Sequence, residues 1–561
     1  MGIDRRGLLT RIGAGALAAP ALAQPTQGAA VAFLHGVASG DPDAHSAVFW
    51  TRVTPADASG ADIELTLQVA RDAAFADVVR TSNGLRARAS RDFTVKHDLD
   101  GQGLEPGTDY FYRFVAGETT SPVGRVRTLP VGAAADVVLA VASCQLYPGG
   151  LFNAYDAMSK LDRLDAVVHL GDYIYEYGAR ETDYGGATGA QLSRLHQPPR
   201  EILTLEDYRL RHAQYKSDPD LQAAHARAAF ICVWDDHEVA NDAWSMGAEN
   251  HTDATEGDYA ARKATALRAY YEWMPIREPR AGLTLDHVNR SFEFGDLATL
   301  AMVETRLLAR QKQLDYAVDM PVVDGRPDVE AFRAVLNAPD RDLLGDEQRD
   351  WLKNVLAASK AANKPWQVLG NQVVMARVNG PDVTRIASPE QIDGMIAGLP
   401  AEVQPGIRQM IDLYSLGVPF GLDSWDGYPA GRERLYAAFA EAGVQPIVLA
   451  GDSHAYWVNE LKDASGARRA VEFGTTGISS PSPGDAVAPL PLGPLLIGAN
   501  EEVVFCDQRA KGYVLLTLTP DRAEARLQAV STILTKPYTA TTLSTWVVTR
   551  DDDGITAPTR A

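Results

Sequence analysis

The sequence predicts an α/β domain preceded by a small all-β sandwich domain. Short segments in which apolar and polar residues alternate fill residues 31–130, as expected of antiparallel strands with one buried face. From residue 136 the pattern changes to apolar strand, polar strand end and amphipathic helix, which is typical of a parallel sheet covered by helices. At 561 residues the chain is also longer than one ordinary hydrophobic core supports.

Residues 1–23 have the features of an export signal. Arg5 and Arg6 precede a moderately apolar run, and residues 21–23 fit the small-x-small pattern of a cleavage site. The run is too short to remain as a transmembrane anchor. The paired arginines predict a twin-arginine signal, with a general secretory signal as the alternative. We therefore expect the twin-arginine export machinery as a partner and a periplasmic or secreted location.

Charge and cysteine content narrow the class of protein. The formal net charge is −20, and no block of Lys and Arg is present to neutralise phosphates, so specific nucleic-acid recognition is not expected. A phosphate ester as substrate remains compatible, because a metal cluster can reverse the field inside a pocket. The sequence contains three cysteines, and their number and spacing indicate no disulfide pattern. Cys232 lies in an apolar strand and is predicted to be a core residue, whereas Cys144 follows a strand and is a candidate metal ligand.

The first domain, residues 31–130, is predicted to be an accessory sandwich of fibronectin or immunoglobulin type. Residues 47–53 and 63–69 alternate as strands do, and turn residues separate them. Residues 104–110 contain the pattern Leu-x-Pro-x-x-x-Tyr, which resembles the corner of fibronectin type III-like domains where a tyrosine hydroxyl bonds to the backbone. No catalytic grouping is evident in this domain.

The second domain, residues 136–545, contains six predicted apolar strands, at residues 137–141, 161–170, 228–233, 298–303, 365–369 and 446–450. Helical patterns lie between them, and in residues 347–359 the apolar side chains share one face, which predicts core packing. Two long segments, residues 178–200 and 379–432, are expected to be irregular and to form a rim or lid over the sheet.

Five clusters of polar residues follow the carboxyl ends of predicted strands. Carboxyl ends of strands are where ligand sites form in open α/β sheets. The clusters are Ser143-Cys144-Gln145, Gly171-Asp172-Tyr173-Ile174-Tyr175, Asp235-Asp236-His237-Glu238, Asn371-Gln372 and Asp452-Ser453-His454. Each alone has an ordinary alternative, such as a turn, a structural histidine or a helix N-cap with acidic first-turn residues. Five together predict one shared site.

The donor types predict two kinds of metal ion. Thiolate, phenolate, imidazole and carboxylate suit a trivalent or soft-tolerant transition metal, with iron as the first choice, and these donors are Cys144, Tyr175, His454 and Asp172. Oxygen donors alone suit Ca²⁺, Mg²⁺ or Mn²⁺, and these come from Asp236, Asn371, Asp452 and the shared Asp172.

Two further residues are predicted to act on the substrate. His237, beside a predicted ligand, is placed to protonate or stabilise a leaving-group oxygen. Arg306 follows the strand at residues 298–303 and is a candidate phosphate clamp through bidentate contacts. The alternative for Arg306 is a structural ion pair with Glu304 or another acid.

These motifs together resemble the PhoD-like alkaline phosphatases, within the calcineurin-like metallophosphoesterases. The stretches that carry the resemblance are residues 33–42, 141–145, 169–177, 234–238 and 450–455, and it covers nearly the whole mature chain. The resemblance implies a four-layer αββα catalytic domain and hydrolysis of phosphomonoesters and phosphodiesters by metal-activated hydroxide. It also implies Fe³⁺ and Ca²⁺ as cofactors, with Zn²⁺, Mn²⁺ or Mg²⁺ as substitutes, and export by the twin-arginine route.

Carried over residue by residue, the resemblance implies iron at Cys144, Asp172, Tyr175 and His454 and calcium at Asp172, Asp236, Asn371 and Asp452, with His237 at the scissile phosphate. In the wider superfamily the position of Asp236 usually holds Asn and that of Asp452 usually holds His. Carboxylates at both positions favour a hard cation such as Ca²⁺.

Two alternative functions stay open at this point. A family member specialised for diesters, for example phospholipid head groups, would be favoured by a wide apolar mouth formed by residues 379–432. A non-catalytic module would instead dock on a cell-surface partner through the amino-terminal sandwich.

Overall fold

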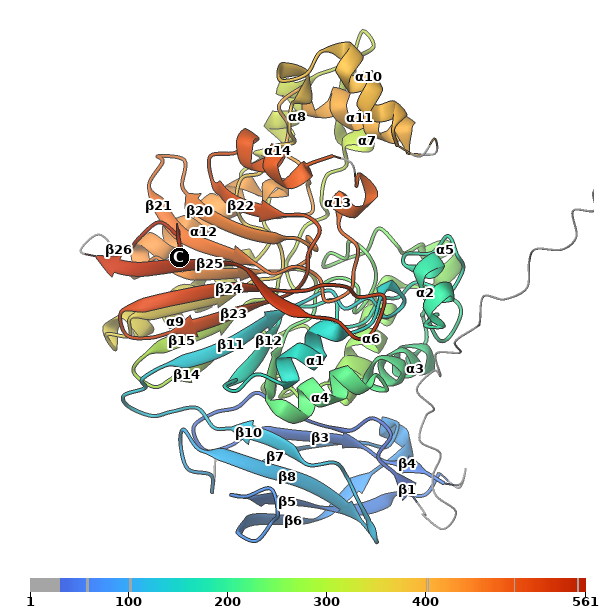
Figure 1. Cartoon of the computed structure of the whole chain (residues 1–561), viewed down its shortest axis with the longest axis vertical. Coiled ribbons are helices and arrows are strands. Elements are labelled where there is room, and N and C mark those ends of the chain that lie inside the picture. Colours follow the sequence, from blue (N-terminus) through green and yellow to red (C-terminus); the bar gives the residue numbers. More distant parts are fainter. Residues whose placement is uncertain are drawn as a thin grey trace, which may run out of the picture.

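The structure, a computed structural model, describes residues 31–561 except 57–59, 100–102, 400, 402, 489 and 552–553. The predicted export signal, residues 1–23, lies outside the described residues. A domain built from β-strands is followed by a larger mixed α/β domain, which lies above it in Figure 1. None of the helices in the described part of the chain is long and apolar enough to span a membrane.

Two facing sheets form the amino-terminal domain and share one core. One sheet contains β5 (Ile63–Ala70), β6 (Val78–Ala87), β8 (Asp109–Ala116), β9 (Thr119–Thr120) and β10 (Gly124–Arg127). The facing strands are β2 (Val37–Gly40), β3 (Val48–Arg52) and β7 (Thr94–Asp98), and the short strands β1 (Val31–Ala32) and β4 (Thr54–Pro55) pair with each other. The Glu105 backbone N–H donates to the Tyr110 hydroxyl at 2.8 Å, which confirms the predicted tyrosine corner.

The first sheet of the α/β domain has the order β26-β25-β24-β23-β11-β12-β13 and continues into β2, β3 and β7. Its strands are β11 (Val137–Ala142), β12 (Ala166–His169), β13 (Ala229–Cys232), β23 (Lys511–Leu518), β24 (Arg522–Val530), β25 (Ala540–Asp551), β26 (Gly554–Ile555) and β27 (Thr559–Arg560). Strands β11, β12 and β13 are parallel, as predicted. The link between the domains is the parallel pair Phe230 and Gly40, so one sheet crosses the domain boundary.

The second sheet has the order β14-β15-β18-β19-β21-β20-β22. Its strands are β14 (Arg290–Phe294), β15 (Ala298–Met302), β18 (Trp366–Gly370), β19 (Ile447–Ala450), β20 (Tyr456–Lys462), β21 (Arg468–Gly474) and β22 (Val503–Asp507). Strands β15, β18, β19 and β21 are parallel. Val141 and Val168 of the first sheet lie in the same buried cluster as Leu300 and Leu449 of the second, so the two sheets pack on each other.

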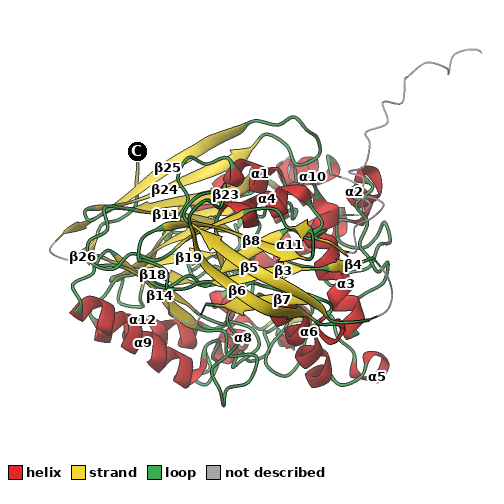
Figure 2. Ribbon diagram, turned by 90° about the horizontal axis from the view of Figure 1, so that it is seen from below, coloured by secondary structure: helices red, strands yellow, loops and turns green. Residues whose placement is uncertain are grey.

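Helices lie on both sides of the stacked sheets, as Figure 2 shows. α9 (Gly345–Ala361) and α12 (Pro429–Ala442) contact the second sheet, whereas α1 (Asn153–Ser159) and α4 (Pro219–Arg227) contact the first. α3 (Leu205–Lys216) packs on α6 (Tyr259–Trp273). On α9, Leu352 and Leu356 are buried and Trp351 and Val355 pack against the same core, which confirms the predicted apolar face.

The prediction that residues 178–200 and 379–432 are irregular is wrong in both segments. The first contains α2 (Gly186–Leu192), and the second contains α10 (Pro389–Ala397) and α11 (Gln404–Tyr414). A local signal for α10 is present, because Ser388 and Gln391 form a capping box at its start. The protrusion at the top of Figure 1 is formed by α10 and α11 together with α7 (Tyr316–Asp319) and α8 (Val329–Leu336). The remaining short strands and α-helices are β16 (Val322–Val323), β17 (Arg326–Pro327), α5 (Asp253–Glu256), α13 (Pro483–Ala486) and α14 (Leu492–Ala499), and the short 3₁₀ helices are η1 (Ala89–Arg91), η2 (Tyr147–Gly149), η3 (Val383–Arg385) and η4 (Trp425–Gly427).

Candidate metal centre

The predicted ligands meet where parallel strands of both sheets end. Cys144, Asp172 and Asp236 follow β11, β12 and β13 of the first sheet, and Asn371, Asp452 and His454 follow β18 and β19 of the second. Backbone bonds tie these turns together: the Cys144 N–H donates to the Gly171 carbonyl at 3.1 Å, and the Asn371 N–H to the Leu449 carbonyl at 3.0 Å.

The backbone at these strand ends is unusual. Gly171 has a φ of +107°, and a Cβ added there would lie 2.4 Å from the backbone nitrogen of Asp235, so only glycine fits. At these strand ends four non-glycine residues have left-handed φ values between 54° and 60°, and these are Cys144, Asp172, Asp452 and His454. Each such conformation costs about 1–3 kcal/mol and is typical of functional sites.

The first donor group contains Cys144, Asp172 and His454, whose ligand atoms lie within 4.8 Å of one another. The Tyr175 hydroxyl donates to Asp172 Oδ2 at 3.0 Å and lies 3.5 Å from His454 Nε2. His454 Nδ1 lies 2.7 Å from the Pro481 carbonyl, which can only accept, so Nδ1 carries the proton and Nε2 presents its lone pair to the group. The structure thus brings together all four donors predicted for iron.

Two further groups share Asp172: one with Asp236 and His237, the other with Asp235 and Asp452. Asp172 is buried, and its Oδ1 atom has no hydrogen-bond partner among the described residues. Burial raises the pKa of Asp172 well above its ordinary value, and the negative charges of its acidic neighbours add to this, although the charge of His237 opposes it. A buried anionic cluster with an orphaned carboxylate oxygen at its centre fits cations that Asp172 would bridge.

The role of Asn371 as a calcium ligand stays a prediction. Its side chain is buried, its amide nitrogen donates to the Val373 carbonyl, and its amide oxygen accepts from Trp425 Nε1 at 3.0 Å. The amide oxygen retains a second lone pair for a cation. Asp235, which the sequence interpretation did not include among the ligands, forms a donor group with Asp172 and Asp452.

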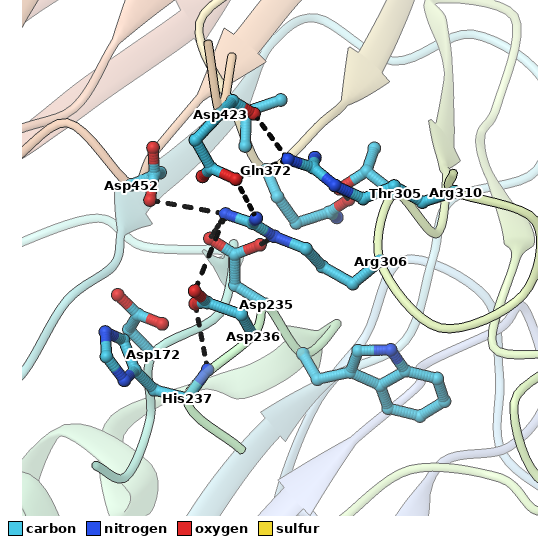
Figure 3. Close-up of polar contacts among 12 residues, drawn as sticks. Asp172, Asp235, Asp236, His237, Thr305, Arg306, Arg310, Gln372, Asp423 and Asp452 are labelled. Atoms are coloured by element: carbon cyan, nitrogen blue, oxygen red, sulfur yellow. Dashed lines mark hydrogen bonds and ion pairs between the residues drawn. The ribbon is translucent and has the colours of Figure 1, made fainter. Parts of the chain in front are cut away.

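His237 is held by a carboxylate. Its Nδ1 lies 2.7 Å from Glu176 Oε2, and the other Glu176 oxygen accepts from the Asn241 N–H at 2.8 Å and from Asn250 Nδ2 at 2.7 Å. Burial alone would lower the pKa of His237, but the negative charges of Asp236, Glu176 and Asp172 raise it well above its ordinary value. Nε2 is therefore the nitrogen available to the site, beside Asp172 in Figure 3.

Arg306 lies among carboxylates, as Figure 3 shows. Its fully buried guanidinium donates to Asp235 Oδ1 at 2.5 Å, to Asp423 Oδ1 at 2.7 Å and to Asp452 Oδ1 at 3.4 Å. The carboxylate of Glu304 accepts from the Arg306 backbone N–H at 2.9 Å instead. Arg306 therefore forms structural ion pairs, as in the alternative given above, but with Asp235 and Asp423 rather than with Glu304. Its role as a phosphate clamp stays a prediction.

Both long segments reach this site. In residues 178–200 the Tyr184 hydroxyl donates to the Pro481 carbonyl at 2.9 Å and lies 3.2 Å from His454 Nδ1, so this segment covers the side of the first donor group. Residues 379–432 contribute Asp423, which contacts Arg306 and Arg310. Sequence reasoning missed Glu176, Asp235 and Asp423. The first two stand inside quoted motifs, whereas Asp423 had no local signal.

Comparison with known proteins agrees with this geometry. Residues 139–527 match the model of the PhoD-like phosphatase, and residues 18–130 match that of the PhoD-like phosphatase N-terminal domain. Over 536 residues the chain is 35% identical to alkaline phosphatase D of Bacillus subtilis (strain 168), covering 93% of this chain and 82% of that protein. The solved structure of PhoD superposes with a TM-score of 0.75 at 31% identity, covering 95% of this chain and 93% of that one.

Fold, site and comparisons define the class of the protein as a phosphoester hydrolase. The chain belongs to the PhoD-like phosphatase family, and it carries the amino-terminal domain of that family.

Proposed function

We propose that the protein is an exported metal-dependent phosphoesterase that hydrolyses phosphomonoesters and phosphodiesters. The observation that carries this proposal is the buried Asp172, shared by three donor groups, one of which contains His237. The likeness to alkaline phosphatase D supports it. The signal predicted at residues 1–23 supports twin-arginine export to a periplasmic or secreted location.

The proposed metals follow the donor types. Fe³⁺ would be held by Cys144, Asp172, Tyr175 and His454, and Ca²⁺ by Asp172, Asp236, Asn371 and Asp452. When bound, such ions polarise a phosphoryl group and lower the pKa of water. The two stacked sheets flanked by helices support the proposed four-layer αββα architecture.

The chain's own contribution to the reaction centres on His237. Glu176 accepts the Nδ1 proton and fixes the ring, so that Nε2 donates a proton to the leaving-group oxygen as the phosphorus–oxygen bond breaks. The ring of Tyr175 packs on His237 with centroids 4.3 Å apart, and that of Tyr177 at 5.4 Å. These contacts keep the imidazole oriented toward the substrate.

The segment at residues 379–432 does not favour a lipid-specialised enzyme. Three of its buried apolar residues, Tyr414, Val418 and Leu422, pack with Phe332 and Leu336 of α8 in a separate small core. To the site it supplies the carboxylate of Asp423 and the indole N–H of Trp425, which donates to Asn371. We therefore propose activity on soluble monoesters and diesters.

The test is an ester assay on protein exported by its own host, with metal content measured on the same sample. Aryl phosphomonoesters and phosphodiesters should both be hydrolysed, and Asp172→Asn and His237→Asn should each lower kcat/KM by about 10²–10⁴-fold. An inactive wild type with a full metal complement would overturn the proposal in favour of the binding module.

A further inference from the structure

A sixth strand end, not among the five clusters above, lies across the first donor group. Residues 475–482, called here the strap, follow β21 and lead into α13, which Figure 1 labels. The strap joins the two sheets through a bridge between Ser143 and Gly477, and the Ile478 N–H donates to the Ser143 carbonyl at 3.1 Å. It therefore crosses the gap between the strand ends that carry Cys144 and His454.

The strap contacts each of the three residues that accompany Asp172 in this group. The Pro481 carbonyl accepts from His454 Nδ1 at 2.7 Å. The Ser480 backbone N–H donates to the Cys144 carbonyl at 3.3 Å, and the Ser480 hydroxyl donates to the same carbonyl at 2.8 Å. The Ser480 Oγ atom also lies 2.7 Å from the Tyr175 hydroxyl. Ser480 thus links a thiol-bearing residue and a phenol directly.

The hydrogen bonds of Ser480 leave room for a change of protonation at Tyr175. With its proton on the Cys144 carbonyl, the Ser480 oxygen accepts from the Leu146 N–H at 3.2 Å, and the single proton of the Tyr175 hydroxyl is shared between Ser480 Oγ and Asp172 Oδ2. If Tyr175 binds a metal as phenolate, the Ser480 hydroxyl can turn its proton to the phenolate oxygen. The Cys144 carbonyl then keeps the N–H groups of Ser479 and Ser480 at 3.4 and 3.3 Å as hydrogen-bond partners, so this buried carbonyl is not left without a donor.

We propose that Ser480 is a positioning residue of the candidate metal centre: its hydroxyl holds Tyr175 against the Cys144 turn and donates to the phenolate when a metal is bound. The proposal rests on the proposed metal-dependent function. Hydrogen bonds to ligand atoms from neighbouring residues typically contribute 10–100-fold in metal affinity, which sets the expected effect.

Ser479 supplies a matched control. It is the preceding residue of the strap, it is equally buried, and its hydroxyl donates to the Leu146 carbonyl at 2.8 Å. The Ser479 side chain therefore stabilises the same strap by one buried hydrogen bond, and that bond goes to a residue outside the donor group.

The experiment compares metal loss from the loaded wild type, Ser480→Ala and Ser479→Ala in excess EDTA, with each element measured over time and folding checked by thermal melting. Ser480→Ala should lose the metal of the first donor group about 10–100-fold faster than the wild type, and Ser479→Ala within about 2-fold of it. If that metal is iron, the tyrosinate band of Ser480→Ala should also move to longer wavelength, because the phenolate loses a hydrogen bond.

Equal rates of metal loss in the two variants, or no change in Ser480→Ala, would overturn the positioning role. A wild type that hydrolyses phosphate esters but holds no metal that EDTA removes would also overturn it, while leaving the hydrolase activity in place. The ester assay and the metal-release assay therefore separate failure of this inference from failure of the proposed function.

Discussion

Around His237, a buried carboxylate and the amides bonded to it hold one imidazole in place. Glu176 is fully buried, and burial would raise its pKa, but the positive charge of His237 and the hydrogen bonds from Asn250 and Asn241 lower it. The carboxylate is therefore ionised and stabilises the imidazolium. This pair is the arrangement that a proton donor needs at alkaline pH, because an isolated imidazole is neutral there.

Replacing Glu176 by Gln tests this pair. The variant keeps the shape of the side chain and removes the charge that raises the pKa of His237, so kcat should fall about 10–100-fold. Because the His237 pKa falls, the alkaline limb of the kcat–pH profile should move to lower pH. The control is Glu249→Gln, an exposed neighbour that accepts from Asn241 Nδ2 at 3.2 Å. An unchanged profile in Glu176→Gln would contradict the assignment.

Arg306 gives a second prediction at this scale. Arg306→Lys keeps one positive charge but cannot span Asp235, Asp423 and Asp452, so buried carboxylates lose their partner. The free energy of unfolding should fall by about 2–4 kcal/mol and metal content should drop. Denaturant unfolding and elemental analysis check this. A raised KM with unchanged stability and metal content would instead indicate a phosphate clamp.

Residue types and their order along the chain predicted which side chains meet at the candidate site, but not which neighbours contact them. Cys144, Asp172 and His454 could be grouped because each follows an apolar strand, and ends of parallel strands meet. Glu176 and Asp235 sit one position from predicted ligands. In a turn, the packing of the backbone decides which of two adjacent side chains faces the site. The periodicity of the sequence does not indicate this choice.

At the scale of elements, the strands could be predicted from the sequence, but the helices in the long segments between them could not. β11 and β19 end within one residue of the predicted limits, because strands buried on both faces are continuous apolar runs bounded by polar turns. α11 packs on α10, but Tyr414 and Leu413 at its carboxyl end share a core with Phe332 and Leu336 of α8, which lies far away in sequence. The protrusion therefore depends on long-range packing that a local pattern does not specify.

Gly171 connects β12 to the site, and Gly171→Ala tests this connection. The new methyl group would meet the Asp235 backbone, so the turn must shift and move Asp172. We expect metal content and kcat/KM to fall by at least about 100-fold, since a displacement of 1 Å costs that much.

The matched control is Gly443→Ala, at a φ of +68° with open space around it, which should cost about 1–2 kcal/mol of unfolding free energy and leave activity intact. Equal effects of the two variants would show that backbone strain, and not the clash with Asp235, is responsible.

At the scale of the whole molecule, the sheet that crosses the domain boundary covers a buried basic cluster. Lys216 of α3 is 1% exposed, and among the described residues no carboxylate pairs with it. Its Nζ lies 3.2 Å from His225 Nε2 and 4.6 Å from the Trp50 ring centroid. Burial lowers the pKa of Lys216 to about 7 and holds His169 and His212 neutral, with pKa values of about 3. A cluster of this kind makes stability depend on pH.

The sign follows from the lowered pKa of Lys216. Between about pH 7 and 10.5 the unfolded chain binds a proton at this lysine that the folded chain does not, so stability rises with pH. Lys216→Met should therefore be more stable than the wild type by a few kcal/mol at pH 7, and this difference should shrink toward pH 10. Denaturant unfolding across this range measures it. The exposed Lys360→Met is the control, and a difference that does not change with pH would refute the assignment.

The left-handed backbone at Asp172, Asp452 and His454 has a consequence for how metal preference can evolve. Asp, Asn and His are the non-glycine residues that adopt this conformation most readily. Exchanges among these three types at positions 452 and 454 change the charge and softness of a donor without a new backbone path, whereas a β-branched residue would require one. A lineage, or a protein engineer, could thus alter which ion is preferred by single substitutions while the place where the ion binds stays fixed.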